Sequence, residues 1–281
     1  MLSRLFVART RVARRPVVTL FLVATGAARL HAQTDFYNTD RGRPLHIEDA
    51  TPIERHALEF QFAPLRLERW AGGSYQWGLE PRLEYGILPR THLDIGAPFA
   101  WRDAAGRTTA ALAGVDVTLL HALNVETTTL PEIAVSASAL LPAGGFGPDR
   151  AYGTLGLLGT RSFAGAIRMH VNGSYTFGAA PQTAGQGAKE LGRWLAGVAV
   201  DKTIAVRSLL FGFETFAQQP LQATEQVEWS SGAGLRYQVD PRWVLDLGAG
   251  RRYTGAQRAW YLTVGGAYAF AWRALLPQGG N

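Results

Sequence analysis

Hydrophobic and polar residues alternate along much of this chain, most clearly in the stretch YQWGLEPRLEYGIL, residues 75–88. Apolar side chains such as Trp77 and Tyr85 occupy odd positions, and charged side chains such as Arg82 and Glu84 occupy even positions. A β-strand points alternate side chains to opposite faces. This stretch is therefore predicted to form a strand with one apolar face and one charged face.

The same alternation recurs almost to the end of the chain, and it predicts an all-β protein. Twelve strands are expected, at residues 58–62, 75–88, 92–101, 114–122, 132–141, 152–161, 167–177, 194–200, 207–216, 227–239, 243–250 and 260–270.

The connections between these strands alternate in length. Short turns are expected at 88–91, 162–165, 201–203 and 239–242, and longer loops at 102–110, 143–150, 178–190, 217–226 and 251–257. Outer-membrane barrels have short periplasmic turns and longer outer loops, and an even strand number leaves both termini on the periplasmic side. A soluble β-sandwich gives no reason for this pattern.

The charged faces decide which side of the strands looks inward. Several ionised side chains on one face are costly in a dry core but not in a watery lumen. Closure into a barrel also leaves no backbone group unpaired in hydrocarbon. Aromatic residues near strand ends, among them Trp77, Trp101, Trp243 and Trp260, are typical of membrane interfaces. The predicted fold is an up-and-down transmembrane β-barrel of twelve antiparallel strands, with its apolar face in lipid.

The first 32 residues predict export. An Arg-rich start, an apolar run and the ending LHA follow the order of a cleaved signal peptide. Residues 33–54 form a polar arm, 55–272 the barrel and 273–281 a C-terminal tail. The expected location is the bacterial outer membrane, with outer-membrane lipid as a partner; the sequence leaves the oligomeric state open.

Charge and composition narrow the function. The whole chain carries +6, from 28 Lys and Arg against 22 Asp and Glu, but the signal segment contains six Arg and no acidic residue. The mature chain is thus formally neutral, which removes the support for nucleic-acid binding. The absence of cysteine excludes disulfides and thiolate metal sites.

The polar face of the strands is the candidate site. Its charged residues and one histidine are predicted to face the lumen, either as a selectivity lining along a solute path or as a salt-bridge network that stiffens a narrow interior. For any single residue the second interpretation is favoured. These candidates are Glu80, Arg82, Glu84, Asp94, Asp116, Arg168, His170, Glu214, Glu228, Arg236 and Asp246.

No catalytic residue, cofactor or metal site is expected. His170 and Ser174 share a strand face, but four residues along a strand is roughly 13 Å, too far for a histidine to activate a hydroxyl. The histidines of the mature chain are singly placed, and the acidic residues lack the spacing of a calcium loop.

Several phrases resemble the outer-membrane family described as the MetA-pathway-of-phenol-degradation, or transporter-type, family. They are LEPRLEYGILPRTHLDIGAPF (79–99), LAGVDVTLLHAL (112–123), EIAVSASALLPAGG (132–145) and MHVNGSYTF (169–177). Val115 stands where the family has glycine before the aspartate. The resemblance implies an outer-membrane barrel that takes up small hydrophobic or aromatic compounds.

Three functions follow as hypotheses. The first is a passive channel or uptake protein for a small, unidentified solute. The second is a structural or binding barrel whose lumen is plugged, with residues 33–54 as the candidate plug. The third, which the chemistry disfavours, is an outer-membrane lipid hydrolase.

Overall fold

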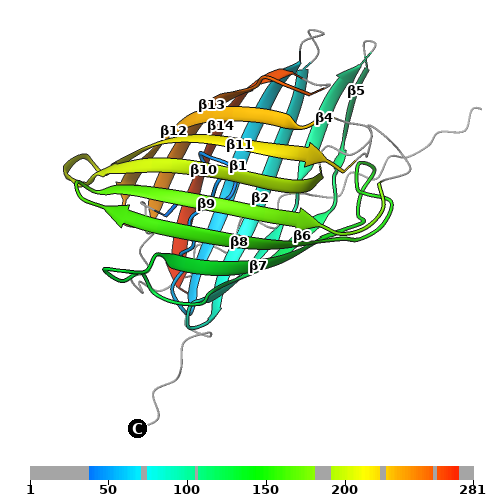
Figure 1. Ribbon diagram of the computed structural model, residues 1–281. Helices are drawn as coiled ribbons and strands as arrows, with labels where there is room; N and C mark the ends of the chain where they lie inside the picture. Colours follow the sequence, from blue (N-terminus) through cyan, green and yellow to red (C-terminus); the bar gives the residue numbers. More distant parts are fainter. Residues whose placement is uncertain are drawn as a thin grey trace, which may run out of the picture.

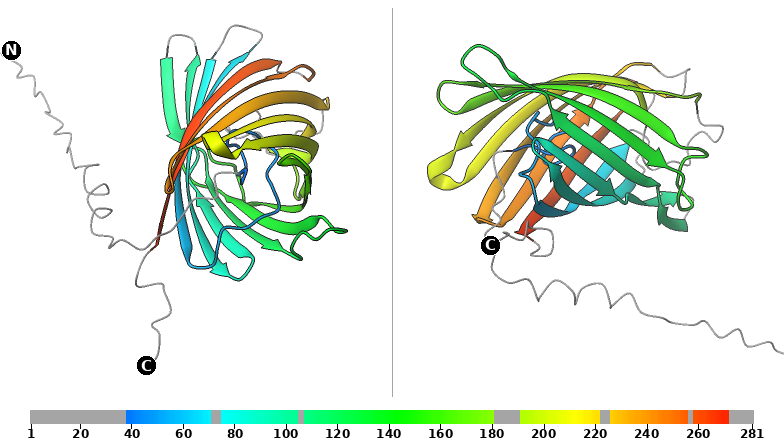
Figure 2. Two further views of the ribbon diagram at one scale, coloured as in Figure 1. Left: turned by 90° about the vertical axis from the view of Figure 1, so that its left-hand side faces the viewer. Right: turned by 90° about the horizontal axis from the view of Figure 1, so that it is seen from below.

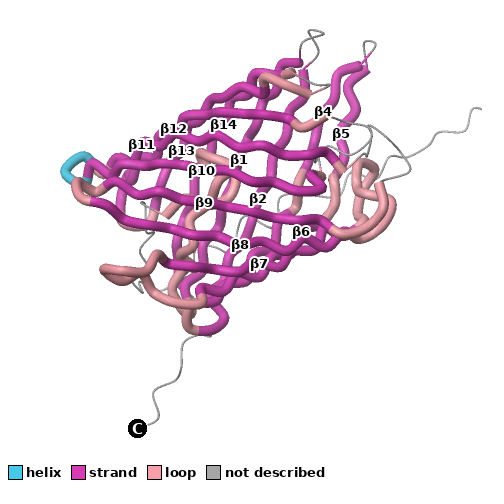
Figure 3. Tube along the Cα trace, viewed as in Figure 1, coloured by secondary structure: helices cyan, strands magenta, loops and turns pink. Residues whose placement is uncertain are grey.

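The computed structural model describes residues 38–70, 75–104, 107–180, 191–221, 226–255 and 258–271. The predicted signal peptide, the start of the polar arm and the C-terminal tail lie outside these residues. Nearly all regular structure is strand, as Figures 1 and 3 show, with a short 3₁₀ turn, η3, at Ala205–Arg207. Within the described ranges, no helix has the length and apolar character needed to cross a membrane.

The strands have the following bounds: β1 Ala57–Trp70, β2 Tyr75–Leu88, β3 Thr91–Gly96, β4 Phe99–Ala104, β5 Arg107–Leu112, β6 Val115–Ala122, β7 Glu132–Leu141, β8 Tyr152–Phe163, β9 Ile167–Thr176, β10 Gly192–Ile204, β11 Leu209–Pro220, β12 Glu228–Asp240, β13 Trp243–Arg252 and β14 Ala259–Ala271.

The sheet closes into a ring, because β1 pairs antiparallel with both β14 and β2. The ring runs through β3 and then β6 to β14, which gives the closed antiparallel barrel of twelve strands that the alternation predicts. The fold-class prediction is therefore confirmed.

One of the expected strands is interrupted. The strand expected at 92–101 divides into β3 and β4 at Ala97–Pro98, whereas the strand expected at 114–122 is β6 and an additional strand, β5, precedes it. Proline has no N–H to donate to a ladder, so it breaks the pairing at this point. β3 pairs with the second half of β2 and β4 with the first half, so the β4–β5 hairpin extends the wall along β2 (Figure 1).

The loop after β7 packs against the end of β5. The backbone N–H of Phe146 donates to the carbonyl of Leu112 at 3.0 Å. Gly144 has a φ of +76°, and a Cβ on it would lie 2.3 Å from the same carbonyl oxygen. Glycine is needed here because only its backbone can approach so closely in this conformation.

Two of the expected connections are wrong, and others are shorter than expected. Residues 201–203 belong to β10, and the turn is made instead by η3 and Ser208, whose φ is 49°. The expected long loop at 102–110 is replaced by β4 and β5, which end at Ala104 and begin at Arg107. Residues 217–220 and 251–252, expected in loops, likewise belong to β11 and β13.

Asp201 shows why the turn expected at 201–203 was wrong. Val200 is exposed and Asp201 is buried, so the alternation of the strand continues through a charged residue. A polar residue in a turn and a polar residue on the inner face of a barrel look alike in sequence, because both interrupt an apolar run.

The two faces of the wall have the predicted orientation. Along β13 the outward Leu245 and Leu247 are 47% and 51% exposed, whereas the inward Val244 and Asp246 are 1% and 5% exposed. Trp243 lies on the outer surface, where exposed rings are suited to a lipid interface. A soluble protein rarely presents so continuous an apolar exterior around a charged interior; this inside-out arrangement is that of an outer-membrane barrel.

Candidate functional site

The interior of the barrel is occupied by residues 38–54, hereafter the lumenal segment, drawn in blue inside the ring of strands in Figure 2. The segment folds back on itself: the N–H of Asp49 donates to the carbonyl of Thr39 at 3.0 Å. It leaves the lumen beside Gly86 of β2, where a Cβ would lie 2.0 Å from the carbonyl oxygen of Glu54. The wall therefore lacks a side chain at the point where the segment passes.

Four inward glycines form a floor beneath the segment. A Cβ on Gly234 would lie 2.5 Å from Cβ of Pro44, and a Cβ on Gly248 would lie 2.5 Å from the carbonyl oxygen of Pro44. Both distances are too short for any side chain to be added without moving the segment. The glycine seat, as we call this floor, consists of Gly197 on β10, Gly212 on β11, Gly234 on β12 and Gly248 on β13.

Apolar packing completes the seat. Leu45 and Ile47 are 1% and 0% exposed, and they pack with Ala199 and Phe216 of the wall. Burying a leucine or isoleucine side chain contributes about 1.5–3 kcal/mol. Farther along the segment, Ala50 joins a second cluster with residues of β6, β7 and β8.

Wall side chains satisfy the backbone of the segment. Glu214 of β11 accepts hydrogen bonds from the N–H groups of His46 and Ile47 at 2.7 and 2.9 Å. Asn172 of β9 accepts from the N–H of Glu48 and donates to its carbonyl, at 2.8 and 2.9 Å. Buried backbone groups need such partners. These side chains therefore supply the hydrogen bonds that a neighbouring strand would supply in a sheet.

An ion-pair network joins the segment to β12 and β13, and Arg43 also pairs with Glu59 of β1 at 3.1 Å. Asp246 binds Arg236 at 2.6 Å and Arg43 of the segment at 3.0 Å. Both guanidinium groups also contact Asp40, and Arg236 donates to the carbonyl oxygens of Asn38 and Arg43. A buried charge without its partner is strongly destabilising, so each member fixes the positions of the others.

A second network lies on β8, β9 and β10. Arg168 pairs with Asp201 at 2.7 Å and with Asp49 of the segment at 3.3 Å. His170 contacts Asp201 through Nε2 at 2.9 Å and Thr160 through Nδ1 at 3.0 Å. The Thr160 hydroxyl oxygen in turn accepts from the N–H of Ala50 at 2.9 Å. The hydroxyl that contacts His170 is thus that of Thr160 rather than Ser174. Its oxygen already accepts a hydrogen bond from the segment.

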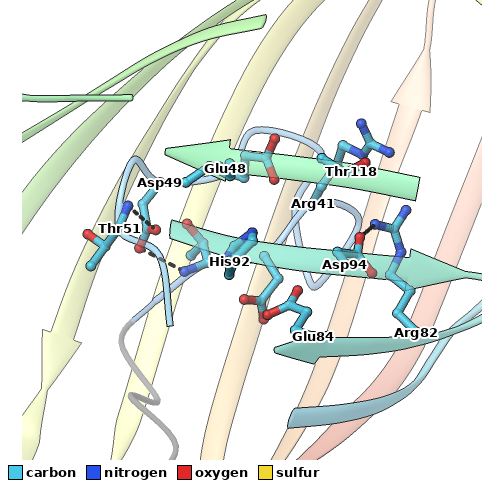
Figure 4. Close-up of a pocket in the computed structure, with 12 residues that line it drawn as sticks. Arg41, Glu48, Asp49, Thr51, Arg82, Glu84, His92, Asp94 and Thr118 are labelled. Atoms are coloured by element: carbon cyan, nitrogen blue, oxygen red, sulfur yellow. Dashed lines mark hydrogen bonds and ion pairs between the residues drawn. The ribbon is translucent and has the colours of Figure 1, made fainter. Parts of the chain in front are cut away.

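The opposite side of the lumen, near β2, β3 and β6, is packed less completely. Arg41 of the segment pairs with Asp116 at 3.1 Å, and Arg82 pairs with Asp94 at 2.5 Å. Between the segment and this wall remains a cavity of about 20 Å³ (Figure 4). That volume holds one or two water molecules. Its acidic lining residues are Asp40, Glu48, Asp49, Glu84 and Asp94, and its arginines are Arg41 and Arg82.

Burial changes the acidity of the segment's own carboxyl groups. Burial raises the pKa of Glu48 to about 7, although Arg41 and Arg82 oppose the rise. Burial also raises the pKa of Asp49, against the effect of Arg168. Burial acts in the same direction on Asp40, but the guanidinium groups of Arg236 and Arg43 outweigh it and hold its pKa below the ordinary value.

All eleven side chains chosen from the sequence are buried or partly buried on the inner face of the wall. Whether they line a solute path stays a prediction. Five of them contact the lumenal segment directly: Asp116, Arg168, Glu214, Arg236 and Asp246. The others contact neighbours on the wall, such as Glu80 with Arg82 and Glu228 with Arg252.

Sequence reasoning missed the partners within the segment, above all Asp40 and Arg43, and the wall residues Gln61 and Asp201. One signal was available. Glycines at even positions of residues 228–252 interrupt an otherwise charged inner face, and glycine within a strand often marks the close approach of another backbone.

No protein-family model matches the sequence, and no curated protein matches it. Solved structures do resemble the fold. The COG4313 outer membrane channel from Pseudomonas putida F1 aligns with a TM-score of 0.54 at 10% identity, over 83% of this chain and 100% of that one. The NanC porin gives 0.51 at 10% identity, over 75% and 98%. The KdgM porin in complex with disordered oligogalacturonate gives 0.50 at 12% identity, over 76% and 99%.

At these identities the likeness concerns the fold. Together with the apolar exterior and the closed ring, it identifies the fold as that of a transmembrane β-barrel of the bacterial outer membrane. The resemblance to the phenol-degradation family stays a prediction.

Proposed function

We propose that the protein is an outer-membrane channel for small solutes whose lumenal segment must move before a solute can pass. The observation that carries this proposal is the segment itself, which lies inside a closed barrel and packs against its wall, with a cavity of about 20 Å³ between it and β2, β3 and β6. A space of that size admits water and no organic solute. Passage therefore requires the segment to be displaced from the glycine seat.

The nature of the contacts supports displacement without unfolding of the barrel. The wall is held by continuous backbone ladders between neighbouring strands. The segment is held by side-chain hydrogen bonds, ion pairs and the apolar packing of Leu45 and Ile47. Water can replace the polar contacts once it enters the lumen. Moving the segment would therefore leave the ladder bonds of the wall intact.

The inner wall also favours one sign of solute. The predicted lining residues include seven carboxylates, at positions 80, 84, 94, 116, 214, 228 and 246, against three arginines, at positions 82, 168 and 236. Displacing the segment removes Arg41 and Arg43 together with Asp40, Glu48 and Asp49, so the wall alone sets the charge of the open lumen. We therefore expect it to prefer cations and neutral solutes over anions. The hydrophobic or aromatic solutes that the family resemblance implies are compatible with that preference.

Planar bilayers test the channel. The wild-type protein is expected to give brief openings, and a variant that lacks residues 38–53 is expected to conduct persistently, with a reversal potential that indicates cation preference. Heat-modifiable migration in detergent shows that each protein is folded. A folded deletion variant that carries no current would contradict the proposal.

The plugged structural barrel is the second candidate, and the apolar packing of Leu45 and Ile47 favours it. A disulfide separates the two. The chain has no cysteine of its own, and the Cβ positions at 44 and 234 need only about 1 Å of separation to reach disulfide geometry. In a channel, Pro44→Cys with Gly234→Cys is expected to abolish the wild-type openings until reductant is added. A structural barrel would show no openings in either state, and the two single variants serve as controls.

A further inference from the structure

Three carboxylates lie side by side on the inner wall, in one row across three strands. Glu59 of β1 is directly opposite Glu84 of β2 in the ladder, and Glu84 is directly opposite Asp94 of β3. Directly opposed side chains have Cβ atoms only about 4.5–5.5 Å apart, and like charges at these positions repel. The row therefore needs a positive charge or a proton to be stable in a buried place.

The lumenal segment adds a fourth carboxylate to this row. One oxygen from each of Asp40, Glu59 and Glu84 lies within 4.8 Å of the other two. Glu59 and Glu84 are 9% and 5% exposed. Three different parts of the chain, the segment, β1 and β2, thus bring acidic oxygens to one point.

The arginines nearby leave this point negative. Arg43 and Arg236 are shared among Asp40, Glu59 and Asp246. With Glu84 there are four carboxylates against two guanidinium groups, an excess of two negative charges when all are ionised. The hydrogen-bond donor to Glu84 is the neutral amide of Gln61, at 2.7 Å.

Oxygens without partners belong to residues that line the neighbouring cavity. Oε2 of Glu84, Oδ1 of Asp94 and Oγ1 of Thr39 are buried without a hydrogen-bond partner, and all three residues line the cavity of about 20 Å³. Thr39 is 1% exposed and lies outside the carboxylate row. Buried polar atoms without partners are costly, and atoms that converge on one cavity indicate an occupant that accepts electron pairs.

We propose that Asp40, Glu59 and Glu84 bind a Ca²⁺ ion that ties the lumenal segment to β1 and β2. Calcium takes six to eight oxygen ligands at about 2.3–2.6 Å, so ligands on opposite sides of the ion are about 4.6–5.2 Å apart. The three carboxylate oxygens fit that span as they stand. Magnesium, at about 2.0–2.1 Å, demands nearly ideal octahedral geometry and usually keeps several waters, so a site built of protein oxygens suits it less well. One Ca²⁺ also cancels the excess of two negative charges.

Gln61 supplies a further ligand. Its Oε1 atom is buried without a partner, and its Nε2 atom contacts both Glu59 and Glu84. The two ends of an amide have nearly the same shape, so a turn about the last side-chain bond presents the oxygen to an ion held by the two glutamates.

The ion gives the segment an attachment on the side of the lumen that lacks the glycine seat. The proposal does not depend on transport, because a permanently plugged barrel would bind the ion equally well. Failure of one proposal therefore leaves the other intact.

Isothermal titration of the mature chain tests the site. The protein is refolded without lipopolysaccharide in a zwitterionic detergent, treated with EDTA and titrated with CaCl₂. We expect one Ca²⁺ per barrel, and weaker binding of Mg²⁺ by at least about tenfold. Glu84→Gln removes a charge while it keeps the shape of the side chain, and is expected to weaken Ca²⁺ binding by at least about tenfold.

The matched control is Glu132→Gln on β7. Glu132 also contacts the segment, by accepting from the Thr51 hydroxyl at 2.8 Å, but it lies outside the row, so Ca²⁺ binding is expected to be unchanged. Asp40→Asn provides a second test that alters no strand, and it decides the question if Glu84→Gln does not fold. Absence of Ca²⁺ binding by the wild type, with protons taken up instead, would overturn the proposal, as would unchanged binding in both cluster variants.

Discussion

The two sides of the lumen hold the same segment in different ways. On the side of β10 to β13, glycines let the backbone of the segment approach the wall, and Asp246 is paired with Arg43 and Arg236. On the side of β1 to β3, Glu84 and Asp94 of the carboxylate row line a small cavity, and each has a buried oxygen without a partner. The first side fixes the segment by shape and paired charge. The second side has unpaired charge and a small space that a bound ion or a moving segment can use.

A single cysteine can report on both sides. Because the chain has no cysteine of its own, Ala50→Cys at a fully buried position reacts with thiol reagents only when the segment is displaced.

The largest effect is expected from Asp246→Asn, which removes one of the two carboxylates that the buried Arg43 and Arg236 share. Loss of one partner from a buried pair costs about 3–5 kcal/mol, and this cost falls on the seated state of the segment. The reaction rate of the Ala50→Cys reporter should rise by two orders of magnitude or more. Asp149→Asn is the control, because its partner Arg150 is at the surface, where a pair contributes about 0–1 kcal/mol. Equal rates in the two variants would show that the glycine side does not fix the segment.

Gly248→Val tests shape without changing charge. The new Cβ would lie 2.5 Å from the carbonyl oxygen of Pro44, and overpacking of this kind costs about 1–3 kcal/mol. The reporter rate is expected to rise roughly five- to hundredfold while heat-modifiable migration stays normal. Gly153→Val is the matched control, since its Cβ would have its nearest neighbour at 4.0 Å. A rate unchanged from the wild type would mean that the glycine seat adapts to the added side chain.

A pH titration probes the cavity side through Glu48. Burial raises the pKa of Glu48 from the ordinary 4.5 to about 7, so the seated state binds a proton more tightly than the displaced state. Seating is therefore most stable below about pH 4.5 and weakens as pH rises toward 7; the raised pKa of Asp49 acts in the same direction. The reporter is expected to react faster at pH 8 than at pH 5 after correction for thiolate formation. Glu48→Gln should remove most of this dependence, and a dependence that persists unchanged would assign it to other groups.

The smallest effect is expected from Arg41→Gln. Arg41 pairs with Asp116 at 3.1 Å, but its side chain is 31% exposed, and water screens such a pair to about 0–1 kcal/mol. The reporter rate should change by less than about fivefold. A change as large as that of Asp246→Asn would make the two sides of the lumen equivalent and end the comparison.

Much of the wall could be predicted because one property repeats along it. Leu245, Asp246 and Leu247 already show in sequence which face meets lipid, since a strand gives each residue a single choice between two faces. The errors fall where this choice is hidden: at Asp201, a buried inner residue mistaken for a turn, and at Pro98, which divides a strand without ending the wall. Inward-facing candidates such as Glu214 and Arg236 could be chosen from their alternate positions along a strand. The residues that they contact in the lumenal segment could not.

By itself, the sequence determined the closed twelve-stranded barrel, its orientation in lipid and the inner face on which charge gathers, because these depend on neighbours two residues apart in the chain. Only the tertiary structure decided that residues 38–54 fill the lumen, that Asp40 meets Glu59 and Glu84, and that His170 faces Thr160. Those contacts join positions far apart in sequence, and the register between strands and the path of the segment set them; no local period of the chain carries that information.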